Sequence, residues 1–271
     1  MILSILWPVV IIAGLSLIFG SLLAVASKYL LPEGDPRVDQ VRDSLPGANC
    51  GACGFAGCDA LARAIVEEGA PINSCPVANA EALKNIAELL GEEIGDFKKL
   101  TAVVACKSNL SNAHIKYVYQ GMEDCVAAAA VSGGYKMCRF SCLGFGNCAK
   151  ICPAGAISVE EGVAVVDSEK CIACGKCATT CPKGIISLIP QDAPVVIMCK
   201  SYGRGKEVRD SCEAGCIGCG LCEKNCAFDA IHLVDNLPVI DYDKCTGCKM
   251  CVEKCPRKCI HVNEESFASV V

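Results

Sequence analysis

Cysteines spaced two or three residues apart constrain this chain more than any other feature. The sequence has 271 residues, and 25 of them are cysteine. Cysteines this close in sequence are poorly placed to bridge one another, and their number is odd, so disulfide pairing does not explain them. Aromatic residues make up only 5% of the chain, which is little for a large hydrophobic core. The pattern favours small domains that fold around metal clusters in a reducing compartment.

Three runs in the second half share one spacing, C-x2-C-x2-C-x3-C. Bacterial ferredoxins hold 4Fe–4S clusters with this spacing, and the runs work in pairs because the last cysteine of each run ligates the cluster of its partner. The second and third runs pair with each other, so the first run needs another partner. The runs consist of Cys171, Cys174, Cys177 and Cys181, of Cys216, Cys219, Cys222 and Cys226, and of Cys245, Cys248, Cys251 and Cys255.

The stretch MCRFSCLGFGNCAKICPAGAI, residues 137 to 157, is the partner that remains. Only its ending, Cys152 followed by Pro153, fits the regular spacing, because the gaps after Cys138 and Cys142 are longer than two residues. The connector that follows Cys152 nevertheless has the length and pattern of the connector between the two later runs. We therefore expect a working cluster site with an enlarged loop, and not a degenerate site.

The pairing rule of two-cluster ferredoxins assigns the ligands of four clusters. The predicted sets are Cys138, Cys142, Cys148 and Cys181; Cys171, Cys174, Cys177 and Cys152; Cys216, Cys219, Cys222 and Cys255; and Cys245, Cys248, Cys251 and Cys226.

Five cysteines are left over by this assignment. Two of them are each followed by Lys-Ser, which indicates a second level of the repeat ahead of each ferredoxin-like unit. We interpret the five as buried or structural thiols, and ligands for a sixth cluster are the alternative. They are Cys106, Cys125, Cys199, Cys212 and Cys259.

A fifth predicted cluster precedes the ferredoxin-like runs. Cys50, Cys53, Cys58 and Cys75 have the spacing C-x2-C-x4-C-x16-C, with small residues between them that let the backbone fold tightly. Residues 59–68 and 77–90 have the apolar periodicity of helices. Four thiolates on a Gly-rich loop favour a 4Fe–4S cluster, while a structural zinc site is the alternative. The total prediction is five 4Fe–4S clusters held by 20 cysteines.

The N-terminus is apolar and carries no charge from residue 2 to residue 26. A helix of this length exceeds the roughly 30 Å hydrocarbon core of a bilayer, so it predicts one tilted transmembrane helix. The first basic residues, Lys28, Arg37 and Arg42, follow the apolar segment. Positive charge on that side predicts a single-pass protein of the cytoplasmic (inner) membrane, with the cluster domains in the cytoplasm. A cleaved signal peptide is the alternative, but no basic region precedes the apolar run.

Electron transfer is the function that these features favour, because a series of clusters conducts electrons and makes or breaks no substrate bonds. The formal charge of −5 and the pI near 5.3 argue against nucleic acid as a partner. No dinucleotide or flavin motif is visible, so no catalytic residue is predicted. The alternatives are a ferredoxin-like subunit of another membrane redox complex, such as a hydrogenase or dehydrogenase, and a redox-sensing scaffold.

The combination LPGANCGACGFAGCDALA…SCP after an uncharged N-terminal helix, with the closing CTGCKMCVEKCPRKCI, resembles the B subunit of Rnf complexes. The resemblance implies a component of an ion-translocating ferredoxin:NAD oxidoreductase. It also implies reduced ferredoxin as the electron donor and membrane-embedded partner subunits that carry flavins and an NADH site. The chain is longer than the members with a single ferredoxin domain, by a unit at roughly 101 to 210.

The expected fold is α+β, in five parts. Residues 1–27 are the transmembrane helix, 28–44 a linker and 45–100 a small helical 4Fe–4S domain. Residues 101–190 and 191–271 are two ferredoxin-like domains with two clusters each.

Overall fold

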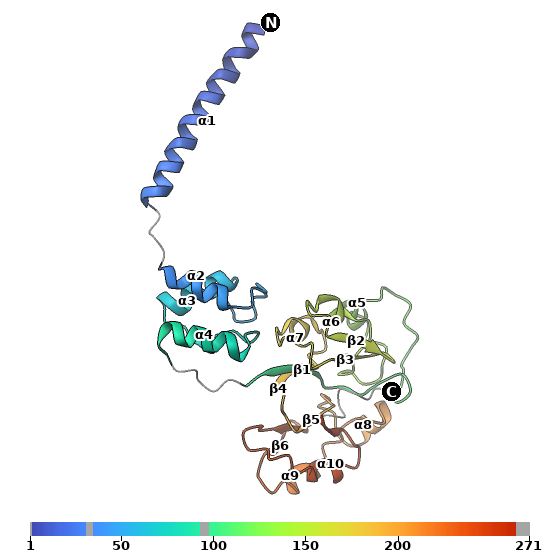
Figure 1. Ribbon diagram of the computed structural model, residues 1–271. Helices are drawn as coiled ribbons and strands as arrows, with labels where there is room; N and C mark the ends of the chain where they lie inside the picture. The colour runs from blue at the N-terminus through green and yellow to red at the C-terminus, as the bar shows by residue number, and fades with distance from the viewer. Residues whose placement is uncertain (1, 31–34, 93–97, 264–271) are drawn as a thin grey trace.

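The computed structural model describes residues 2–30, 35–92 and 98–263. It begins with one long helix, α1 (Ile2–Leu30), which projects from the rest of the protein (Figure 1). The side chains of α1 that the structure describes, Trp7 and those of residues 11–25, are all exposed. Within the described residues, no helix combines the length and the apolar character that a membrane crossing requires.

A small helical unit follows, made of α2 (Pro36–Ser44), α3 (Cys58–Glu67), the 3-10 helix η1 (Ile72–Ser74) and α4 (Ala80–Leu90). The predicted helices at 59–68 and 77–90 are confirmed as α3 and α4. Leu61 of α3 and Leu83 and Ile86 of α4 repeat at helical spacing and are almost completely buried in one core. This core fixes the helices that flank the four N-terminal cysteines.

Helix α2 lies in the stretch expected to be a linker. Its start has a clear physical cause, because the Asp35 side chain accepts a hydrogen bond from the backbone N–H of Arg37 at 2.9 Å and Pro36 occupies the first helical position. Val41 is fully buried in the core with α3 and α4. Helix α2 therefore packs as part of the helical unit.

In the rest of the described chain, one pattern of elements occurs twice: a strand, two helices, two strands, a helix and a final strand. The first copy holds β1 (Leu100–Val104), α5 (Cys125–Ala130), α6 (Asn147–Ile151), β2 (Ile157–Glu160), β3 (Val163–Val166), α7 (Lys176–Thr180) and β4 (Ile186–Pro190). The second copy holds β5 (Val195–Ile197), α8 (Lys206–Ser211), α9 (Leu221–Lys224), β6 (Ile231–Val234), β7 (Leu237–Ile240), α10 (Met250–Glu253) and β8 (Ile260–Val262).

Each copy closes on itself through the same two strand pairs. In the first, β1 pairs antiparallel with β4 and β2 pairs antiparallel with β3. In the second, β5 pairs with β8 and β6 with β7 in the same sense. The first and last strands of each copy thus lie side by side, which brings the two ends of the copy together, as β1 and β4 show in Figure 1.

The two copies meet through residues that follow their first strands. Single antiparallel bridges join Cys106 to Cys199 and Ala113 to Cys212. Val103 from β1 and Val196 from β5 share a small buried cluster with Met198. The junction therefore places one cysteine of each copy directly opposite the other.

Gly144 provides a test of a close contact within the first copy. Its φ is +76°, and an added Cβ would lie 2.6 Å from the carbonyl oxygen of Gly162 in the β2–β3 turn. Gly155 also has a positive φ, of +59°, but has open space around it. Gly155→Ala should cost about 1 kcal/mol from backbone strain alone, and Gly144→Ala about 1–3 kcal/mol more. Apparent thermal unfolding midpoints, measured anaerobically by circular dichroism, should fall further for Gly144→Ala; equal midpoints would contradict the close contact.

Candidate metal centres

The N-terminal cysteines lie around the start of α3. Cys58 is the first residue of α3, and the Asn49 side-chain oxygen accepts a hydrogen bond from its backbone N–H at 2.8 Å. Cys75 follows η1 and is buried. Burial raises the pKa of Cys75, and the nearby Cys53 and Cys50 thiolates raise it further. The structure thus brings Cys75 to the loop cysteines across 16 intervening residues.

The final predicted set shares one cavity. Cys245, Cys248 and Cys251, with Cys226 from the preceding run, line a cavity of about 340 Å³. The other walls include Val195 and other mostly apolar residues. The crossing cysteine therefore reaches the run of its partner, as in a two-cluster ferredoxin.

The second predicted set also comes together. Burial raises the pKa of Cys177 to about 11, and the charges of the Cys171, Cys174 and Cys152 thiolates add to the rise. Cys177 is buried in a core against which Cys152 and Cys171 also pack. The run and its crossing cysteine thus lie in one part of the first ferredoxin-like domain.

The third predicted set has an additional cysteine beside it. Burial raises the pKa of Cys222 to about 11, with further contributions from Cys216 and Cys219. Cys255 lies near Cys216, and the Sγ of Cys259 is 3.5 Å from the Sγ of Cys255. A hydrogen bond from the Cys259 thiol lowers the pKa of Cys255 to about 5. Cys259 thus contacts this group as a hydrogen-bond donor.

The first predicted set is arranged differently. Cys142, Cys148 and Cys181 line a cavity of about 380 Å³, but the fourth cysteine in its wall is Cys125. Burial raises the pKa of Cys148 to about 12, and the charges of Cys142, Cys125 and Cys181 add to the rise. Cys138 lines a different cavity.

Helices α5 and α6 hold Cys125 in place. Cys125 begins α5, and its backbone N–H donates to the side-chain oxygen of Asn147, the first residue of α6, at 2.9 Å. The amide nitrogen of Asn147 donates to Asp124 at 2.6 Å, and Asp124 itself caps α5 by accepting from the backbone N–H groups of Val126 and Ala127. The first residue of α6 thus holds the start of α5 in place.

The sequence carries a signal that one ligand comes from outside the first run, and the prediction from spacing missed it. Counted back from Cys152, the regular spacing places cysteines at 148, 145 and 142, and position 145 is phenylalanine. The run is therefore regular, with Phe145 in place of its second cysteine. The Phe145 ring packs against Tyr119 and Tyr135, with ring centroids 5.4 and 5.9 Å away. The replaced cysteine indicates that a ligand must come from elsewhere in the chain.

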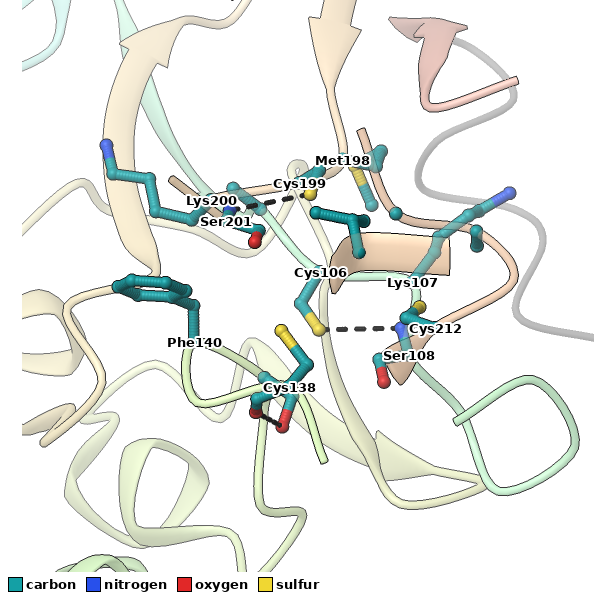
Figure 2. Close-up of a pocket in the computed structure, with 15 residues that line it drawn as sticks. Cys106, Lys107, Ser108, Cys138, Phe140, Met198, Cys199, Lys200, Ser201 and Cys212 are labelled. Atoms are coloured by element: carbon teal, nitrogen blue, oxygen red, sulfur yellow. Dashed lines mark hydrogen bonds between the residues drawn. The ribbon is translucent and has the colours of Figure 1, made fainter. Parts of the chain in front are cut away.

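The remaining spare cysteines also gather. Cys106, Cys199 and Cys212 line a cavity of about 320 Å³ together with Cys138 (Figure 2). Three cavities of similar volume are thus each lined by four cysteines.

The donor sets fit iron–sulfur clusters. Each of the three cavities offers four cysteine sulfurs, which is the ligand set of a 4Fe–4S cluster. In the described part of the chain, no three His, Cys, Asp or Glu side chains lie close enough together to share one metal ion. The cysteines surround a space and are distributed around it, as a cluster with four separate iron atoms requires.

Known protein families match the cysteine-bearing segments. Residues 45–77 match the family described as "Putative Fe-S cluster", and residues 138–185 match a 4Fe-4S dicluster domain. Residues 213–229 and 238–261 each match a 4Fe-4S binding domain. The irregular stretch from Cys138 thus lies inside the segment that matches the dicluster domain.

Relatives match nearly the whole chain. The B subunit of the ion-translocating oxidoreductase complex of Methanosarcina acetivorans is 44% identical over 238 residues, which cover 88% of this chain and 90% of the relative. The chain belongs to the family of Rnf B subunits. The B subunit of the Na(+)-translocating ferredoxin:NAD(+) oxidoreductase complex of Acetobacterium woodii is 47% identical over 89% of this chain and 73% of its own length.

A third member is the B subunit of the proton-translocating ferredoxin:NAD(+) oxidoreductase complex of Clostridium ljungdahlii, 40% identical over 89% of this chain and 86% of its own length. The predicted resemblance to Rnf B subunits is confirmed. The protein is an iron–sulfur electron-transfer subunit of an oxidoreductase complex.

Proposed function

We propose that the protein accepts electrons from reduced ferredoxin and passes them through its clusters to membrane subunits of a ferredoxin:NAD oxidoreductase. The observation that carries the proposal is the gathering of four cysteines around each of several cavities, within a family of complex subunits. The names of the relatives from Acetobacterium and Clostridium share the donor and the acceptor but differ in the ion. The proposal therefore covers the electron path and leaves the ion open.

The domain bounds proposed for the electron path follow the strand pairs. We take residues 45–100, together with α2, as the first cluster domain, and residues 101–190 and 191–271 as the two ferredoxin-like domains. The pairing of β1 with β4 and of β5 with β8 supports the bounds of the latter two.

Five ligand sets follow from the gathered cysteines, and one differs from the sequence prediction. Cys125 replaces Cys138 in the set with Cys142, Cys148 and Cys181. The other sets are Cys50, Cys53, Cys58 and Cys75; Cys171, Cys174, Cys177 and Cys152; Cys216, Cys219, Cys222 and Cys255; and Cys245, Cys248, Cys251 and Cys226.

The chain's own groups would tune these sites. A bound 4Fe–4S cluster supplies one-electron chemistry, at a potential that depends on burial and on hydrogen bonds to its sulfurs. The backbone N–H of Ala156 donates to the crossing Cys152 at 3.4 Å, and that of Ala230 donates to Cys226 at the same distance. The last cysteine of the first run in each domain therefore accepts from an alanine N–H four residues further along the chain.

We propose that the N-terminal segment anchors the protein in the cytoplasmic membrane, with the cluster domains on the cytoplasmic side. The support is its sequence, which carries no charge from residue 2 to residue 26, since no described helix by itself has the length and apolar character of a membrane span. The described side chains of α1 include Leu15, Phe19 and Leu22, which are about half or more exposed, and burial of such apolar surface in lipid is favourable. Lys28, Arg37 and Arg42 follow the apolar residues and support the orientation.

The anchor predicts membrane association that depends on α1. The full chain should remain with the membrane after an alkaline carbonate wash, whereas a chain that starts at residue 35 should be released with its iron content unchanged. Retention of both chains would place the attachment elsewhere, and release of both would contradict an integral anchor.

Electron acceptance from ferredoxin can be tested with the purified full chain. Mixing with chemically reduced ferredoxin in an anaerobic stopped-flow instrument should bleach the cluster absorbance of the chain while the ferredoxin is reoxidised. Reduction by dithionite serves as the control for intact clusters. Clusters that accept electrons from dithionite but not from ferredoxin would exclude ferredoxin as the donor.

The role of Cys125 makes a separate prediction. Cys125→Ala should remove about four iron atoms per chain, because it takes one ligand from one 4Fe–4S cluster. Val126→Ala, at the adjacent exposed position of α5, is the matched control and should keep the full iron content. Iron and acid-labile sulfide are measured on both variants. An unchanged content in Cys125→Ala would return the ligand role to Cys138.

A further inference from the structure

We propose that Cys106, Cys138, Cys199 and Cys212 form an additional 4Fe–4S site at the junction of the two ferredoxin-like domains. The inference deepens the proposed function, since it rests on iron–sulfur chemistry in this chain. It changes the predicted number of clusters from five to six. Of the spare cysteines, only Cys259 then has no ligand role.

Four separate segments bring these sulfurs to one place. Cys106 follows β1 and Cys199 follows β5, and the two residues face each other in an antiparallel bridge. Cys212 directly follows α8, and Cys138 lies in the loop before α6. All four line the cavity of about 320 Å³ between the two ferredoxin-like domains, and Figure 2 labels each of them. Convergence from such distant points of the sequence is not expected of unrelated buried thiols.

The cavity resembles one whose ligands the sequence predicts. The regular set of Cys226, Cys245, Cys248 and Cys251 lines about 340 Å³, and the junction cavity has nearly the same volume. Both have four cysteines in their walls. The junction therefore offers the same donor set in a similar space.

Each ferredoxin-like domain supplies an equivalent pair of cysteines to this site. Cys106 and Cys199 each begin a Cys-Lys-Ser sequence. Cys138 precedes Cys142 by the same number of residues as Cys212 precedes Cys216. Each domain thus contributes one cysteine after its first strand and one just before its first cluster run, which makes the site pseudo-symmetric.

The hydrogen bonds repeat in the same way. The Cys106 sulfur accepts from the backbone N–H of Ser108 at 3.4 Å and from that of Cys142 at 3.3 Å. The Cys199 sulfur accepts from Ser201 at 3.5 Å and from Cys216 at 3.3 Å. Two N–H donors directed at one sulfur stabilise its charged form, and here they offset part of the burial that raises the pKa of Cys106 to about 12 and that of Cys199 to about 11. Metal-ligating cysteines are thiolates, and the matching donors favour that form in both domains.

A buried lysine adds a counter-charge. Lys136 is completely buried, and its ammonium donates to the backbone oxygens of Ser108 and Gly162. Ser108 is also the residue whose N–H binds the Cys106 sulfur. Because a buried cation requires a compensating negative charge, Lys136 suits a site in which four thiolates surround a cluster.

Iron content of the anaerobically purified full chain tests the site. Six clusters predict about 24 iron atoms and as many sulfides per chain, against about 20 for five. Cys106→Ala combined with Cys199→Ala should lower the content by about four, and so should Cys138→Ala alone. Val239→Ala, at an exposed position of β7 outside every cysteine set, is the control and should leave the content unchanged.

A double variant separates this site from its neighbour. Cys125→Ala and Cys138→Ala together should remove about eight iron atoms, because the two residues belong to different clusters. Loss of only about four would mean that they share one cluster. Spin counting by EPR after dithionite reduction should show the same differences, and circular dichroism checks that each variant remains folded.

The outcomes distinguish this proposal from the proposed function. A wild-type content near 20 iron atoms that survives the loss of Cys106 and Cys199 overturns the sixth site and leaves the electron-transfer function intact. One zinc per chain that is lost with these cysteines also overturns it. Failure of all clusters to accept electrons from ferredoxin would overturn the function and leave the iron count, and thus the sixth site, standing.

Discussion

The convergence of four cysteine sulfurs on one cavity is the constraint on which the rest of this structure depends. The described strands form four separate sheets of two strands each, and an isolated strand pair is at best marginally stable in water. Cysteines occupy much of what would otherwise be core, since four of them belong to the buried core of the first ferredoxin-like domain and five to that of the second. Cluster binding is then coupled to folding, because the ligands must be deprotonated and brought together at the same time.

The pairing of first and last strands explains how distant ligands meet. The first run of each domain, which includes α6 or α9, lies early in the domain. The cysteine proposed to complete its ligand set comes from the end of the second run, so the chain must return to its start. The antiparallel pairs β1–β4 and β5–β8 perform this return in the same way in both domains. The exchange of last cysteines between runs thus depends on the sheets, although no cysteine ligand lies inside the paired strands.

Local spacing made part of this arrangement predictable. The three regular runs, the helices at 59–68 and 77–90 and the two-domain repeat could be read from the sequence, because each depends on residues that are close together in the chain. The role proposed for Cys125 could not be predicted from local spacing, because Cys125 lies in a separate helix, 17 residues before Cys142. Cys138, which lies nearer, took its place in the prediction. The start of α2 carried a visible signal in Asp35-Pro36, but the three Pro and Gly residues nearby favoured a linker.

The proposed junction site also accounts for contacts between the domains. The backbone N–H of Cys142, a proposed ligand in the first domain, donates to the Cys106 sulfur, and that of Cys216, a proposed ligand in the second, donates to the Cys199 sulfur. The junction cysteines are therefore joined by one hydrogen bond to a cluster set on each side. Because each domain supplies only half of the four sulfurs, neither can form the site alone. The Cys-Lys-Ser sequences and the additional cysteines ahead of each run exceed what a two-cluster ferredoxin needs, and a site shared between two such domains gives both features a physical reason.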